Sequence, residues 1–196
     1  MLAEFEIISD PLRPSIRTNL CSVCCRHKNT SKKIGCCSYE PEFCLFDLIF
    51  LHLYYPDIYE LIMKNGRIIE GYNGIMLEMK VGLNQCPFAS NQGCVLPKDA
   101  MTPLCRLYIC REAAVFGPAL IEERFDDYFK SKEYELNNYL NNKLIYDQNF
   151  NSTKLHDFII EFSQPIKTMI AEIDRTKPTV ETYHREINIE DFKLVL

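Results

Sequence analysis

The ten cysteines are the residues of this 196-residue chain whose chemistry is most evident. They form two groups, one within residues 21–44 and the other within residues 86–110, and no cysteine follows. Thiolates two or three residues apart reach one metal ion, and pairs from separate segments complete a tetrahedral site with sulfur about 2.3 Å from zinc. Iron–sulfur clusters are also held by cysteine thiolates. The grouping predicts a bipartite site for zinc or an iron–sulfur cluster.

The first group holds more thiols than one site needs, so only part of it is assigned to the metal. Cys25, Cys44 and Cys110 stay open between ligands and small buried hydrophobic residues, and Cys44 lies in an apolar run. The metal ligands predicted from the spacing are Cys21, Cys24, Cys36, Cys37, Cys86, Cys94 and Cys105.

Positive charge accompanies these thiols. Residues 13–33 carry six Lys and Arg and no Asp or Glu. Nearby cations favour thiolate over thiol, which suits a metal site, although a solvated basic loop that offsets the charge of the cluster is an equal interpretation. Arg106 follows a predicted ligand, and we expect it to bind the cofactor by donating to a thiolate or a bound anion. A surface ion pair is the alternative for Arg106.

The motifs resemble those of a known family. They are Cys21 with Cys24 or Cys25, Gly35-Cys36-Cys37, Cys86-Pro87-Phe88, Gly93-Cys94 and Pro103-Leu104-Cys105-Arg106-Leu107-Tyr108. Together they are similar to the zinc- or iron-chelating cysteine-cluster family that includes flagellin lysine methylases, over residues 21–110. The resemblance implies a bound metal and leaves zinc and iron–sulfur both open. The chain departs from the family in the ten residues between Cys25 and Cys36 and in the extra Cys44 and Cys110.

Composition narrows the classes of function. The net charge of −5 disfavours a nucleic-acid binder, which needs clustered Lys and Arg. No nucleotide-loop or hydrolase signature is present, so whether the chain is an enzyme stays open. The longest apolar stretch, residues 43–55, is shorter than the roughly 20 residues that cross a bilayer, and no secretory signal is evident. We expect a cytoplasmic protein without membrane contact, whose reduced thiols favour metal binding over disulfides.

The pattern of apolar residues predicts an α+β fold, mostly helical, with cysteine-rich metal-binding loops around helices and a small β-hairpin, and with C-terminal helices. An irregular arm with a short strand at 5–8 is expected over residues 1–20, followed by a cysteine-bearing loop over 21–37. Helices are predicted at 41–55, 57–64 and from Thr102-Pro103, and the hairpin at 67–70 and 75–81. Helical spacing resumes beyond residue 118, a final amphipathic helix begins near 152, and the tail supplies an edge strand near Ile187 and Ile189.

Two regions follow from this pattern: a cysteine-cluster metal-binding region at 1–117 and a helical C-terminal extension at 118–196, packed on the same domain. The favoured function is a metal-binding protein whose biochemical role the sequence leaves unassigned. One alternative is a redox or modifying enzyme with an iron–sulfur cluster or an open metal site. The other is a metal-supported interaction module, in which the apolar stripe at 158–170 of the C-terminal helices docks a protein partner.

Overall fold

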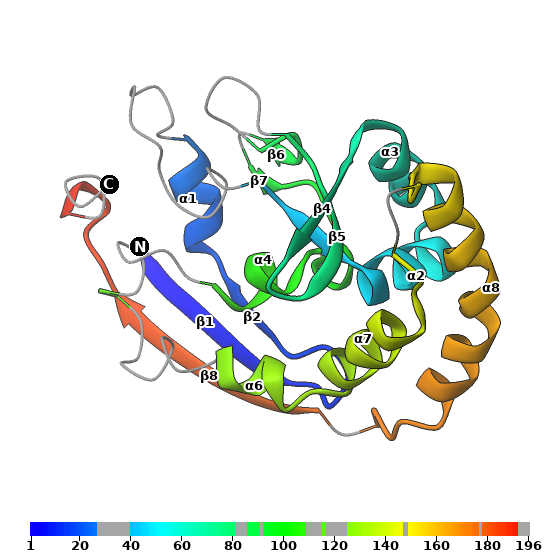
Figure 1. The fold of residues 1–196 in the computed structure, drawn as a ribbon. Helices are drawn as coiled ribbons and strands as arrows, with labels where there is room; N and C mark the ends of the chain where they lie inside the picture. The colour runs from blue at the N-terminus through cyan, green and yellow to red at the C-terminus, as the bar shows by residue number, and fades with distance from the viewer. Residues whose placement is uncertain are drawn as a thin grey trace.

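The computed structural model describes residues 1–26, 40–80, 86–90, 92–108, 115–116, 125–146, 149–176 and 178–191. Within these ranges helix is more abundant than strand, and the strands form two three-stranded sheets and one two-stranded sheet (Figure 1). The α+β class predicted from the sequence is thereby confirmed.

The first sheet joins strands from opposite parts of the chain in the order β2-β1-β8: β1 (Leu2–Ser9), β2 (Ser15–Thr18) and β8 (Thr179–Glu186). β1 is regular because Ala3, Phe5 and Ile7 alternate with polar residues and are buried. The prediction of an irregular arm was therefore wrong for residues 2–4 and 15–18, which are strands, whereas residues 10–14 are irregular as expected. The predicted edge strand of the tail exists, but it precedes Ile187 and Ile189.

The second sheet contains the predicted hairpin, β4 (Arg67–Gly71) and β5 (Gly74–Glu78), with Tyr72 and Asn73 as the turn. Gly74 follows the turn at φ +86°, a conformation that favours glycine. A third strand, β3 (Glu42–Cys44), pairs with β5 and places Phe43 opposite Leu77. The helix predicted from residue 41 is therefore wrong in its first residues.

The helices that follow agree with the prediction more closely. α2 (Leu45–Tyr54) begins at Cys44, where the Asp47 carboxylate accepts a hydrogen bond from the Cys44 amide (3.2 Å). α3 (Pro56–Asn65) starts at a proline, which suits the first turn of a helix.

The C-terminal helices complete the core. α6 (Phe125–Phe129) and α7 (Lys132–Lys143) precede α8 (Ser152–Ala171), which packs along α2 (Figure 1). Asn151 caps α8 by accepting hydrogen bonds from the amides of Thr153 and Lys154. The predicted stripe is buried in this core, so it is not available as the partner-docking surface suggested by the sequence. Its buried members are Leu155, Phe158, Ile159, Ile166 and Ile170.

The described cysteine-bearing segments form short elements. α1 (Leu20–Arg26) replaces the loop predicted from residue 21. β6 (Ala89–Ser90), β7 (Gly93–Cys94), the 3-10 helix η2 (Lys98–Ala100) and α4 (Pro103–Leu107) make up the second segment. α1 packs beside β7 (Figure 1), which brings the two cysteine groups together.

None of the helices in the described ranges has the length and apolar character that a bilayer span requires.

Candidate metal centre

Four cysteines from four separate places in the chain line one pocket of about 260 Å³. Cys21 lies in the first turn of α1, Cys86 precedes the β6–β7 hairpin, Cys94 ends β7, and Cys105 lies in the middle of α4. Among the described side chains, the pocket therefore joins Cys21 of the first group to three thiols of the second, as a bipartite site requires.

The β6–β7 hairpin positions two of these thiols. Ala89 lies opposite Cys94 in the ladder, and its amide also donates to the Cys86 carbonyl (3.0 Å). The Ser90 hydroxyl donates to the Gly93 carbonyl (2.8 Å) and closes the turn, where Gly93 has a φ of +116°. This tight hairpin holds the chain around Cys86 beside the end of β7.

The third thiol of the second group is held by the start of α4. The Thr102 hydroxyl accepts a hydrogen bond from the Cys105 amide (3.4 Å), and Pro103 occupies the first turn. Thr102 thus caps α4 as the sequence predicted. The Lys98 ammonium donates to the Cys105 carbonyl (3.4 Å), so a cation lies beside this thiol.

The thiols influence one another electrostatically. Burial raises the pKa of Cys105 to about 11, a value that includes smaller contributions from the neighbouring Cys86 and Cys94 and the opposing hydrogen bond with Thr102. Burial also raises the pKa of Cys94, with contributions from Cys86 and Cys21. Lys98 opposes the rise in the pKa of both Cys94 and Cys105. When these thiols ionise, their negative charges repel one another and raise their pKa values. A bound cation would remove this repulsion and stabilise the thiolates.

Two basic residues, Arg17 and Lys98, line the same pocket. Four thiolates around a divalent ion carry a net charge of about −2, which two cations offset. The donor set and the charge of the wall both suit a metal–thiolate group.

The described thiols are not arranged to hold an ion as they stand. Across the described side chains, no group of three or more His, Cys, Asp or Glu has the arrangement of a completed metal site. A single zinc ion would have to draw the thiols inward. A polynuclear iron–sulfur cluster would bridge a wider spacing, because its cysteines bind different iron atoms.

The other predicted ligands have different positions. Cys24 and Cys25 lie in α1, but their side chains fall outside the described residues, as do Cys36, Cys37 and Cys110 entirely.

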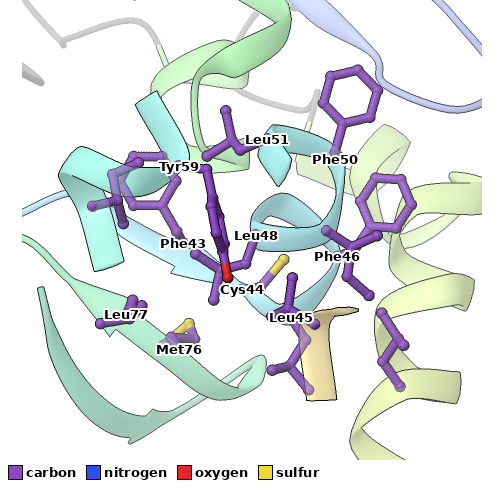
Figure 2. Close-up of a cluster of buried hydrophobic side chains, with 14 of the residues drawn as sticks. Phe43, Cys44, Leu45, Phe46, Leu48, Phe50, Leu51, Tyr59, Met76 and Leu77 are labelled. Carbon is purple, nitrogen blue, oxygen red and sulfur yellow. The ribbon is translucent and has the colours of Figure 1, made fainter. Parts of the chain in front are cut away.

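Cys44 is a core residue: its side chain is 1% exposed, and its thiol donates to Asp47 Oδ2 (3.2 Å). Figure 2 shows it among the apolar side chains around α2. Burial raises the pKa of Cys44 well above its usual value, which keeps the thiol protonated. The buried alternative predicted for Cys44 is the one found.

Arg106 is fully buried and its guanidinium is engaged by the protein. It donates to the carbonyls of Met101 (3.0 Å) and Pro14 (2.6 Å) and to the Glu133 carboxylate. The sequence suggested either a surface ion pair or a contact with a thiolate for Arg106, and the structure shows a buried ion pair with Glu133 instead. Binding of Arg106 to a cofactor stays a prediction.

The carboxylate of Glu133 belongs to a buried ion cluster of Arg13, Asp47, Arg106 and Glu133. Arg13 donates to Asp47 (2.6 Å) and lies 3.4 Å from Glu133. Burial raises the pKa of Glu133, against the opposing effect of Arg106 and Arg13. Sequence reasoning missed this cluster, for which the one available signal was the presence of Asp47 in an apolar run.

Comparison of the chain with protein-family models, with curated proteins and with solved structures found no match.

Proposed function

We propose that this protein binds a metal group, either a zinc ion or an iron–sulfur cluster, through Cys21, Cys86, Cys94 and Cys105. The observation that carries the proposal is the convergence of these four thiols on one pocket from both cysteine groups. Four thiols are the full ligand set of a structural zinc site and of the common iron–sulfur clusters. Membership of the cysteine-cluster family remains a prediction that rests on the motifs alone.

The proposed role of the metal is structural. It would link α1, the β6–β7 hairpin and α4, and the two hairpin strands are only two residues long. Such short elements bury little apolar surface, so metal–thiolate bonds would contribute much of their folding free energy. With all four thiolates bound to the metal, no coordination position stays open for a substrate.

Purification without chelators under anaerobic conditions, followed by elemental analysis, tests this function. The expected result is one equivalent of zinc in a colourless protein, or iron with matching acid-labile sulfide in a brown one. A protein with neither metal, in which the thiols of the native state titrate as readily as those of the denatured state, contradicts the proposal.

Variants identify the ligands. Cys86→Ser and Cys105→Ser each remove a thiol of the pocket, and we expect both to lower the bound metal and the thermal stability. Cys44→Ala is the matched control, because Cys44 is buried in the core instead of lining the pocket. Full metal content in both Cys86→Ser and Cys105→Ser would mean that the pocket thiols are not the ligands.

A further inference from the structure

β8 is an edge strand with little burial of its own. It pairs with β1 along all eight residues, and among the described strands none lies on its other side. Seven of its eight residues are exposed, and Tyr183 is half-buried. The strand therefore depends almost entirely on one ladder of hydrogen bonds.

The backbone groups on the open side can be identified from the end of this ladder. The Met1 ammonium donates to the Ile187 carbonyl (2.7 Å), and the Ile187 amide donates to the Met1 carbonyl (2.9 Å). Hydrogen-bonded and non-hydrogen-bonded pairs alternate along an antiparallel ladder. The odd-numbered residues of β8 therefore bond to β1, and the open edge carries the amides and carbonyls of Val180, Thr182, His184 and Glu186.

β8 has few of the features that protect an edge from pairing, and its charged residues are of both signs. Its sequence, TVETYHRE, contains no proline, glycine or lysine and is rich in residues that favour strands. An edge of this kind accepts another strand through main-chain hydrogen bonds.

We infer that β8 pairs antiparallel with β8 of a second copy, forming a two-fold symmetric dimer with one continuous sheet. Main-chain pairing requires that open-edge residues lie opposite open-edge residues. The register that uses the whole edge places Thr182 opposite His184 of the second copy, and Val180 opposite its Glu186. The two-fold axis then passes through Tyr183.

The same register makes the charges complementary. Glu181 lies opposite Arg185 of the second copy, and the symmetry repeats this pair on the other side of Tyr183. These are non-hydrogen-bonded positions, where opposing side chains approach most closely. Within one copy, the Tyr183 hydroxyl donates to Glu181 Oε2 (2.8 Å) and holds the carboxylate on this face. A shift of the register by two residues in either direction separates both ion pairs.

Sedimentation equilibrium of the full chain, in reducing buffer and at constant metal content, tests the dimer. Glu181→Arg and Arg185→Glu each put like charges opposite one another, and we expect each to weaken association by about tenfold. The double variant restores opposite charges and should restore the affinity. Glu161→Arg, at an exposed site on α8, is the control for the change in net charge.

Thr182→Pro separates pairing from folding. The Thr182 amide points to the open edge, so proline removes a donor that β1 does not use. The variant should keep the circular dichroism spectrum of the parent and be monomeric. A parent chain that stays monomeric to about 1 mM overturns the inference. So does a dimer that tolerates Thr182→Pro, or a double charge variant no tighter than the single ones.

Discussion

Cys105 and Arg106 are neighbours in α4 but have different surroundings. Cys105 lines the thiol pocket, whereas Arg106 is fully buried and donates to Glu133 on α7. Met101 contacts both sites: it lines the thiol pocket, and its carbonyl accepts hydrogen bonds from Arg13 and Arg106 of the ion cluster. Residues 101–106 are therefore a wall shared by the proposed metal site and the buried ion cluster.

Removal of the proposed metal should make residues 101–106 more mobile. Chelation would break the bond between the metal and Cys105, so α4 would be less constrained. The hydrogen bonds of Arg106, which lies next to Cys105 in α4, would then break more often. We expect faster amide hydrogen exchange over residues 101–107 in the metal-free protein. Amides of α8, which packs on α2 away from the pocket, serve as the control. Identical exchange over 101–107 in both forms would show that the two sites are independent.

Removing one member of the ion cluster should destabilise the fold more than replacing an oppositely charged pair by apolar residues. Arg106→Leu leaves the fully buried Glu133 with only the longer contact to Arg13, so we expect a loss of about 3–5 kcal/mol in the free energy of unfolding. Arg106→Leu with Glu133→Leu removes one positive and one negative charge and leaves the Arg13–Asp47 pair intact. Urea unfolding should show the double variant to be more stable than the single one, whereas additive losses would exclude coupling between the two residues.

Cys44 should matter for stability alone. Cys44→Ala removes a buried thiol and its hydrogen bond to Asp47, and we expect a loss of about 1 kcal/mol with unchanged metal stoichiometry. Thermal unfolding and elemental analysis of the same preparation measure both quantities. A fall in metal content would place Cys44 among the ligands.

Asn141 links the hairpin to α7. Its side chain accepts from the Ile75 amide (3.0 Å) and donates to the Asn73 carbonyl (2.9 Å). Asn141→Ala leaves these backbone groups without that partner, so we expect a loss of about 2 kcal/mol in the free energy of unfolding. The exposed neighbour Asn142 is the control, and its replacement by alanine should change stability by less than about 0.5 kcal/mol. Equal losses at both positions would contradict the role of Asn141.

Asp10 should make stability depend on pH. Burial alone would raise its pKa, but hydrogen bonds from Arg175 and from the amides of Arg13 and Leu12 lower it overall. A lowered pKa stabilises the folded state above the ordinary aspartate pKa, and the effect disappears as the pH falls through the folded-state value. Asp10→Asn should therefore cost about 1 kcal/mol at pH 7, a modest amount because the pair is partly exposed.

The difference between this variant and the parent should narrow below about pH 4. Urea unfolding at several pH values between 7 and 3.5 measures it. A difference that stays constant over this range would show that the charge of Asp10 is not the cause.

Local patterns in the sequence were enough for several elements. Asn73-Gly74 lies in the turn of the predicted hairpin, Thr102-Pro103 marked the start of α4, and the last helix begins near residue 152 as predicted. In each case a turn or cap residue acts on its immediate neighbours, so its effect is visible in a short window.

The elements that the sequence did not predict depend on tertiary contacts. β8 carries almost no apolar alternation, because its partner β1 supplies the buried face, and Glu42–Cys44 is a strand because β5 lies beside it. The choice of Cys21, Cys86, Cys94 and Cys105 as the pocket thiols depends on the packing of α1 against β7. The sequence could propose these thiols but could not show that the four of them line one pocket.

The pairing of β1 with β8 has a consequence for the order of folding during synthesis. Met1 and Ile187, which close this ladder, lie 186 positions apart, so β1 leaves the ribosome long before its neighbour is made. The hairpin and α2 involve contacts closer in sequence and can form earlier, whereas the β1–β8 ladder must wait until residues 179–186 have been made. In the interval, the four-residue β2 is the one described strand that can pair with β1, so the open side of β1 is a segment that a chaperone could protect from aggregation.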